Sequence, residues 1–146
     1  MIVKRLAIGL FCALSFGSAS AQVPPEVAII DATLKTCLAK GGGVTPAIDK
    51  CTEQARNSAD LILNRVYGGW LKQLKDPAKD QAADSAEILK RLIASERAWI
   101  TYRDTNCNLE SIQMLGGTGE TNVYGDCLYV ETRQRVLDLQ RIQASR

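Results

Sequence analysis

Hydrophobic residues recur every three, four or seven positions along most of the chain, which is the spacing of α-helices that bury one face. The first such stretch spans residues 24–40 and ends at three consecutive glycines, residues 41–43. A second stretch begins at Thr45-Pro46, where threonine suits the N-cap and proline suits the first helical turn. The pattern therefore predicts two helices joined by a short glycine turn.

A pair of glycines interrupts the second stretch. Gly68 and Gly69 each cost about 1 kcal/mol relative to alanine inside a helix, so we expect a kink there. The apolar pattern resumes at Trp70. The following segment, residues 77–84, is the most charged and least apolar part of the chain, and it predicts a connection or a frayed helix start.

The clearest periodicity predicts a third helix of roughly 30 residues that starts near Ser85 and buries one apolar stripe. The glycine-rich segment 116–119 ends it, and a last helix is predicted from about Thr121. No stretch alternates as a strand does. The predicted fold class is therefore all-α, a small antiparallel bundle of three to four helices. The residues of the predicted stripe are Ala86, Ile93, Ile100, Cys107 and Met114, with Leu89 and Leu92 beside them.

The first residues of the chain have the features of a secretory signal peptide. Two basic residues precede an apolar run, residues 6–16, and small residues at Ala19 and Ala21 mark a cleavage site after Ala21. No later segment approaches the roughly 20 apolar residues that a membrane span requires. We expect residues 1–21 to be removed and residues 22–146 to form one periplasmic or secreted domain without a membrane span.

The numbers of basic and acidic residues indicate which classes of partner the protein can attract by its net charge. The whole chain has 18 basic and 16 acidic residues, and the two basic residues of the signal peptide account for the difference. The mature chain therefore has no formal net charge. This balance gives no electrostatic basis for a nucleic acid or an anionic membrane as the main partner.

Four cysteines remain in the mature chain, and in an exported protein an even number predicts disulfide bonds. Four cysteines allow three pairings, which the sequence alone does not separate. Pairing neighbours in the sequence is the most economical choice, because each pair then flanks a glycine-rich turn. A zinc site is disfavoured, since the chain has neither a C-x-x-C motif nor a histidine. The economical pairs are Cys37 with Cys51 and Cys107 with Cys127.

The densest group of functional side chains lies in the third predicted helix. Trp99 and Arg103 are four residues apart and share a helix face, which favours a cation–π contact. The adjacent Arg103 and Asp104 point in different directions, so we expect no local ion pair between them. Glu96 and Glu110 each lie seven residues from Arg103 and place acidic groups on either side of it. We interpret this group as a polar seam between helices rather than a ligand site.

Catalytic chemistry has little support in the sequence. The commonest general base, histidine, is absent, and oxidised cysteines provide no thiolate nucleophile. A carboxylate pair of the glycosidase type can be assembled from Glu96, Glu110 or Glu131, but no feature of the sequence selects such a pair. We therefore predict no catalytic residue, no metal site and no cofactor.

The glycine-rich segment after the third helix does not follow a strand and lacks the G-x-x-x-x-G-K motif, so phosphate binding is disfavoured. Two interpretations remain: a plain turn between helices, or a protruding loop braced by a disulfide bond. A braced loop has little entropy left to lose when it enters the cleft of a partner. The residues of this candidate partner-contact loop are Gly116, Gly117, Thr118, Gly119, Glu120, Thr121 and Asn122.

The order of these motifs resembles the family of exported domains called the lysozyme-inhibitor LprI N-terminal domain. That family combines two spaced cysteines, an A-D-x-x-L-N-x-x-Y segment, a W-x-x-x-R-D-x-x-C segment, a glycine pair and a C-x-x-x-x-T-x-x-R ending. The chain presents all of them in this order over nearly the whole mature sequence. It departs from the pattern at Ser95-Glu96, where an Ala-Gln pair is common, and so gains a charge in the seam. The matching polar residues are Asn64, Tyr67, Trp99, Arg103, Asp104, Thr132 and Arg135.

The resemblance implies an α-helical, disulfide-bonded, exported domain that inhibits lysozyme as a protein ligand. Inhibition would be steric, with the loop at residues 116–122 in the sugar cleft and with Glu120 and Asp126 complementing a cationic lysozyme. The alternative is a non-catalytic structural or interaction module of the cell envelope, with an unassigned partner, in which the seam only holds helices together. The third and least supported hypothesis is an enzyme that acts on cell-wall glycan.

Overall fold

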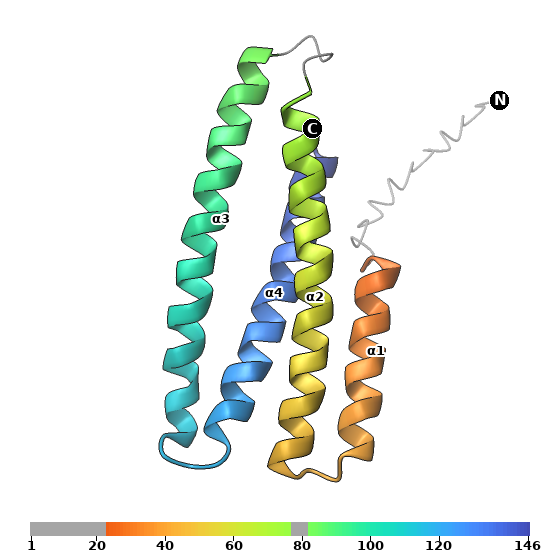
Figure 1. Cartoon of the computed structure of the whole chain (residues 1–146), viewed down its shortest axis with the longest axis vertical. Helices are drawn as coiled ribbons and strands as arrows, with labels where there is room; N and C mark the ends of the chain where they lie inside the picture. Colours follow the sequence, from red (N-terminus) through yellow and green to blue (C-terminus); the bar gives the residue numbers. More distant parts are fainter. Residues whose placement is uncertain (1–22, 77–81) are drawn as a thin grey trace, which may run out of the picture.

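The computed structural model describes residues 23–76 and 82–146, and these form four α-helices and one short 3-10 helix, with no β-strand among them (Figure 1). The all-α prediction is thus confirmed. The predicted signal peptide and most of the charged segment at residues 77–84 lie outside the described residues. The elements are α1 (Pro25–Lys40), α2 (Thr45–Leu74), α3 (Ala82–Ser111), the 3-10 helix η1 (Ile112–Met114) and α4 (Glu120–Ala144).

The helices alternate in direction, so that the α1–α2 turn and the α3–α4 connection both lie at the lower end of the molecule in Figure 1. The most extensive contact is between α2 and α4. Helix α1 packs on α2, and α3 packs mainly on α4. The predicted antiparallel bundle is therefore built around a central α2–α4 pair, with α1 and α3 on its flanks.

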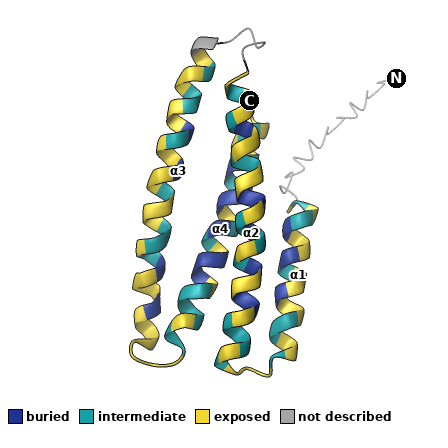
Figure 2. Cartoon of the chain, viewed as in Figure 1, coloured by how far each residue is buried: buried dark blue, intermediate teal, exposed yellow. Residues whose placement is uncertain are grey.

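Most of the hydrophobic core is shared by α1, α2 and α4, as the distribution of buried positions in Figure 2 shows. Helix α3 contributes Leu92 to this core, and most of its other positions are at least partly exposed. At the lower end Cys107, Cys127 and Leu128 form a second, small buried cluster. The core is therefore concentrated away from α3. The most deeply buried side chains are Val27, Cys107, Thr132, Val136 and Leu139.

The glycine pair in α2 does not interrupt the helix. Gly68 and Gly69 are exposed, and α2 continues through both of them to Leu74. Leu63 and Trp70, on either side of the pair, are buried in the core. The helix continues through the glycine pair because burial of this face stabilises it by more than the two glycines destabilise it.

The buried face of α3 differs from the predicted stripe. Ile100 and Met114 are exposed, and of the predicted positions only Leu92 and Cys107 are buried. The buried residues of α3 instead include Glu96 and Ser111. The prediction is wrong because apolar periodicity cannot detect a helix interface that uses charged side chains.

Both disulfide bonds join the pairs that the economical interpretation selects. Cys37 and Cys51 connect α1 to α2, with their Cα atoms 5.7 Å apart, and Cys107 and Cys127 connect α3 to α4 at 5.4 Å. The sequence separations are 14 and 20 residues, so each bond is expected to contribute on the order of 3 kcal/mol by restricting the unfolded chain. Each helical hairpin is therefore fastened close to its turn.

A polar contact fastens α1 to α4 as well. The Asp31 carboxylate accepts hydrogen bonds from the Tyr129 hydroxyl and from the Arg133 guanidinium, whose Nη2 lies 2.7 Å from Asp31 Oδ2. The hydrogen bonds from Arg133 lower the pKa of Asp31, although partial burial opposes them. Burial and the Asp31 carboxylate together raise the pKa of Tyr129. The charged form of Asp31 is thus part of the folded structure.

Candidate functional site

The predicted polar seam is centred on Trp99, whose ring is contacted by two guanidinium groups. Arg103, one helical turn further along α3, places its Cζ atom 4.9 Å from the centroid of the Trp99 ring. Arg135 reaches the same ring from α4, with its Cζ atom 5.7 Å from the centroid. The predicted cation–π contact of Arg103 is confirmed, and a second cation from another helix joins it.

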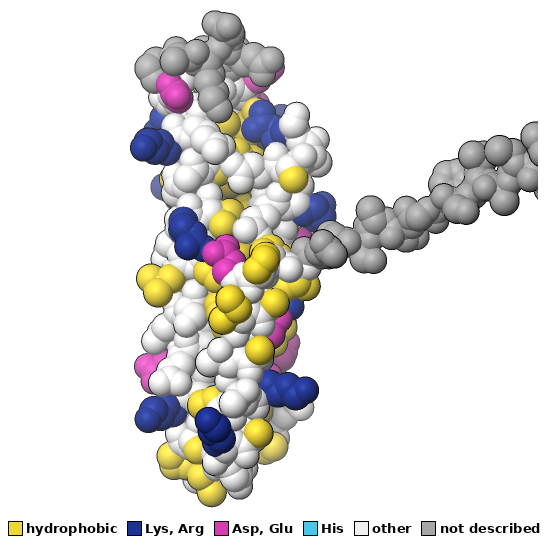
Figure 3. All heavy atoms as spheres, turned by 90° about the vertical axis from the view of Figure 1, so that its right-hand side faces the viewer, with side chains coloured by type: hydrophobic (Ala, Val, Ile, Leu, Met, Phe, Trp, Pro, Cys, Tyr) yellow, Lys and Arg dark blue, Asp and Glu magenta, His cyan; other side chains and the backbone are white. Residues whose placement is uncertain are grey.

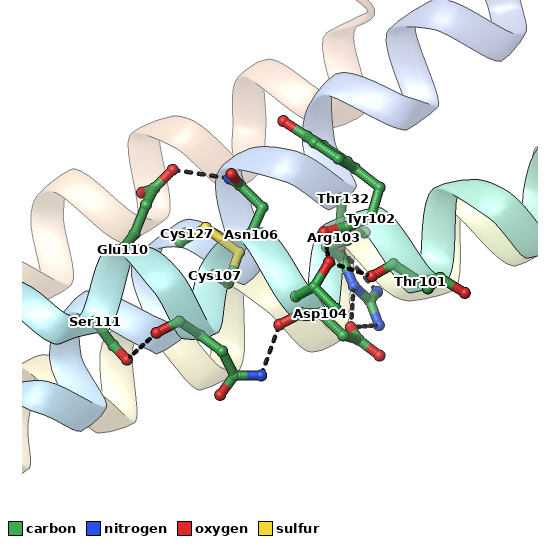
Figure 4. Close-up of a disulfide and its surroundings, with 12 residues drawn as sticks. Thr101, Tyr102, Arg103, Asp104, Asn106, Cys107, Glu110, Ser111, Cys127 and Thr132 are labelled. Carbon is green, nitrogen blue, oxygen red and sulfur yellow. Dashed lines mark hydrogen bonds and ion pairs between the residues drawn. A yellow bond between two sulfur atoms is a disulfide. The ribbon is translucent and has the colours of Figure 1, made fainter.

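Arg103 forms an ion pair with Asp104. The expectation that these adjacent residues form no local ion pair is therefore wrong. The Nε and Nη2 atoms of Arg103 lie 2.9 Å and 2.8 Å from Asp104 Oδ1, because the long side chain folds back across the helix (Figure 4). Its Nη1 atom lies 3.4 Å from the Thr132 hydroxyl of α4 and 3.8 Å from Asp60 Oδ1 of α2. Arg103 therefore links three helices through Asp104, Thr132 and Asp60.

The two glutamates expected beside Arg103 have other partners. Glu96 accepts a hydrogen bond from Arg135, with 2.9 Å between Oε2 and Nε, and both side chains are buried. The Arg135 Nη2 atom donates to the Ser95 hydroxyl at 2.8 Å. Glu110 accepts from the Asn106 amide at 2.9 Å. Both residues of the Ser95-Glu96 departure thus contact Arg135, and the added charge is neutralised inside the bundle.

The remaining seam residues differ in burial. Thr132 is completely buried, and Tyr67 packs against the hydrophobic core from α2. Burial, and then the negative charge of Glu96, raise the pKa of Tyr67. Asn64 lies exposed on α2. Apart from Asn64, the structure thus gathers the predicted seam residues where α2, α3 and α4 meet. Asp60 also belongs to this group, although the sequence analysis did not name it. Its position in the A-D-x-x-L-N-x-x-Y segment could have identified it.

The predicted partner-contact loop is a tight turn whose first glycine needs a left-handed backbone. Gly116 has a φ of 75°, and its N–H donates to Glu120 Oε2 at 3.0 Å. The Gly117 N–H donates to the Met114 carbonyl at 2.8 Å. Glu120 therefore braces the turn, and its carboxylate is already engaged within the chain.

The end of the same segment is attached to the start of α2. The Asn122 amide donates to the Thr45 carbonyl at 3.1 Å and also to Asp49, and the Thr121 hydroxyl lies 3.2 Å from Asp49 Oδ2. Helix α4 already begins at Glu120. Within residues 116–122 the exposed positions are residues 116–118 and Thr121.

A groove of about 490 Å³ lies beside this connection, between the α1–α2 turn and the α3–α4 hairpin. Its wall includes apolar side chains from three helices, together with Glu110 and Asp126. Partial burial of the carboxyl group, and then the charge of Glu110, raise the pKa of Asp126. The residues on the apolar wall are Leu38, Ile48, Val123 and Cys127.

The described residues contain neither a candidate metal site nor a candidate membrane span. In residues 23–76 and 82–146, no group of three or more Asp, Glu or Cys side chains is placed to hold a metal ion. In the same part of the chain, no helix combines the length and the apolar character that a bilayer crossing demands.

The family model described as "Lysozyme inhibitor LprI" matches residues 37–139, more than two thirds of the chain. The chain belongs to this LprI family. The resemblance inferred from the motif order is thus confirmed, and the matched range begins at Cys37 and contains both disulfides and the whole seam.

The chain is similar to two proteins whose names give no activity. "Uncharacterized protein R02472" from Rhizobium meliloti (strain 1021) is 33% identical over 98 residues, which cover 65% of this chain and 70% of that protein. "Uncharacterized protein YecT" from Escherichia coli (strain K12) is 27% identical over 143 residues, with 89% and 88% covered. No solved structure matches the chain significantly. The similarity to YecT thus extends along almost the full length of both proteins.

Proposed function

We propose that this LprI family member is an exported protein that binds lysozyme and inhibits it by blocking the sugar cleft. The observation that carries the proposal is the match of residues 37–139 to a family of lysozyme inhibitors. The signal-peptide features of residues 1–21 and the two disulfide bonds support export to an oxidising compartment. Such a protein acts by occupying a surface and needs no catalytic group of its own.

The α3–α4 end has the rigidity that a blocking surface requires. The Cys107–Cys127 bond, the Gly116–Glu120 hydrogen bond and the Asn122–Thr45 hydrogen bond all restrain it. A restrained surface loses little conformational entropy on binding, so more of the contact energy contributes to affinity. We therefore place the lysozyme contact at this end of the bundle.

The test is a turbidity assay of cell-wall lysis by lysozymes of several classes, with increasing amounts of the oxidised protein. Dose-dependent inhibition is the expected result, and it should decline in a variant that lacks Gly117 and Thr118. A variant with the exposed Leu61→Ser substitution on α2 serves as the control and should inhibit like the wild type. Unchanged lysis in every class, by protein with a helical circular-dichroism spectrum, would exclude the proposal.

A structural module of the envelope is the second candidate, and the placement of the seam favours it. Trp99, Arg103, Thr132 and Arg135 contact one another across helices and are mostly buried. In this alternative they serve only the fold, and Arg103→Ala lowers the melting temperature more than Leu61→Ser does. If Arg103→Ala melts like the wild type but loses inhibition, the seam is a binding site instead.

A further inference from the structure

The lower end of the bundle exposes a concentration of large hydrophobic side chains, which we call the apolar tip. Its four members lie within seven residues and are between 51% and 72% exposed. No stretch of similar length elsewhere in the described chain exposes as many. Single exposed hydrophobic residues are ordinary, but a contiguous group marks an interaction surface. The members of the apolar tip are Leu109, Ile112, Met114 and Leu115.

The apolar tip is held in place by the same contacts that brace the turn. Leu109 lies two residues after the disulfide-bonded Cys107, and Ile112 and Met114 belong to η1. The Ser111 hydroxyl donates to the Asn108 carbonyl at 2.9 Å at the end of α3. Met114 also covers Gly119, where an added Cβ atom would lie 3.4 Å from the methionine Cγ. These contacts restrain the backbone that carries the exposed side chains of the tip.

The charges around the apolar tip indicate the chemistry of its partner. Residues 104–131 contain five acidic residues and no lysine, arginine or histidine. Two of these, Glu110 and Asp126, are exposed and line the groove between the α1–α2 turn and the α3–α4 hairpin. The lysines of the same end, Lys40 and Lys50, belong to α1 and α2. Figure 3 shows Lys and Arg side chains near the lower end of the side on which α1 lies. The α3–α4 side therefore complements a surface with an apolar centre and a cationic rim.

We infer that the apolar tip, rather than the glycine turn itself, makes the central contact with lysozyme, and that Glu110 and Asp126 face basic residues at the rim of its cleft. This inference rests on the proposed function and names the residues that perform it. The buried apolar centre provides most of the affinity, whereas the carboxylates accelerate association. The glycines of the turn have no side chains, so the chain beside the tip takes up little space.

The test compares two variants with matched chemistry. Leu109→Ser combined with Leu115→Ser removes two members of the apolar tip. Leu61→Ser changes a leucine of equal exposure, 73%, on the outer surface of α2. Binding of each oxidised protein to a c-type and a g-type lysozyme is measured by calorimetry, after thermal melts show equal folding. We expect the dissociation constant of the double variant to rise at least tenfold and that of Leu61→Ser to stay within about twofold.

The outcomes separate the inference from the proposed function. If the wild type binds and inhibits lysozyme while the tip variant binds equally well, the inference is overturned and the inhibitor function stands. If the folded wild type binds neither lysozyme, both are overturned. In a second arm, Glu110→Gln with Asp126→Asn should lower the association rate and its salt dependence, whereas Glu53→Gln on α2 should not. An unchanged salt dependence would overturn the role given to the two carboxylates.

Discussion

The polar seam and the apolar tip reverse the usual placement of side chains. In the seam, charged groups such as Glu96 and Arg135 are buried between helices, whereas the tip exposes Leu109 and Leu115 to solvent. Burying charge is costly unless every group is paired, and exposing a hydrophobic cluster forgoes burial energy. The comparison teaches that the residues which look chemical in the sequence are packed between helices, whereas large hydrophobic residues that resemble core positions are exposed, where we propose that they bind the partner.

The largest effect on stability should come from breaking the buried ion pair. Glu96→Ala leaves the Arg135 guanidinium buried without its carboxylate, which is expected to cost about 3–5 kcal/mol of unfolding free energy. Glu96→Gln keeps an oxygen that can accept the hydrogen bond and should cost clearly less. Urea unfolding of both variants measures the difference. An unfolding free energy of Glu96→Ala within about 0.5 kcal/mol of the wild type would remove the structural role of the seam.

The next largest effect concerns the bond that supports the apolar tip. Replacing Cys107 and Cys127 by serine should lower the unfolding free energy by about 3 kcal/mol, and replacing Cys37 and Cys51 should have an effect of similar size. Only the first pair lies next to the tip. The two double variants, compared by urea unfolding and by inhibition assays, should therefore differ in inhibition more than in stability. Equal loss of inhibition in both would argue against a contact confined to the α3–α4 end.

Replacing Gly116 or Gly68 by alanine should change the stability of the protein by a smaller amount, and in opposite directions. Gly116→Ala forces an alanine into a left-handed backbone and should destabilise the protein by about 1 kcal/mol. Gly68→Ala should stabilise it by about 0.5–1 kcal/mol, because the position is helical and no atom lies within 4 Å of the added Cβ. Thermal melts of the two variants check this. A stabilised Gly116→Ala would show that the turn beside the tip is not restrained.

The smallest effect is a pH dependence from the contact between α1 and α4. The pKa of Asp31 is lowered in the folded state, so its contribution to stability is present above the unfolded pKa of about 3.9 and lost as the pH falls through the folded pKa. The side chain is 37% exposed, and solvent screening limits the effect to about 1 kcal/mol or less. Urea unfolding from pH 7 to pH 2 should show Asp31→Asn and wild type converging at acidic pH. A constant difference between them would contradict the ionic contact.

Local signals in the sequence were sufficient for the architecture. Apolar spacing and the glycine turns at residues 41–43 and 116–119 predict the helices, and pairing cysteines across those turns predicts both disulfides. These features depend on residues close together in the chain. The helix through Gly68 is different, because its continuity depends on packing against α4, which no local propensity records.

The seam and the tip were less predictable because both depend on distant partners. Glu96 and Arg135 are 39 residues apart, so nothing near Glu96 indicates that its charge is neutralised inside the bundle. Helical spacing placed Met114 in a buried stripe, but α3 ends at Ser111, before that residue. The motif order did identify Trp99 and Arg103 as important. The prediction of a polar seam between helices also placed their contacts correctly, but it did not name Asp60 of α2 or the second cation, Arg135 of α4, as partners.

Hydrogen–deuterium exchange, measured on the oxidised protein with and without an inhibited lysozyme, compares the two regions directly. If the tip binds and the seam supports the fold, lysozyme should slow exchange in residues 109–118 and leave residues 95–103 unchanged. The η1 segment and the turn lie outside the long helices, so their amides should exchange fast enough for protection to be seen. Protection confined to residues 95–103, with none at the tip, would contradict this division of roles.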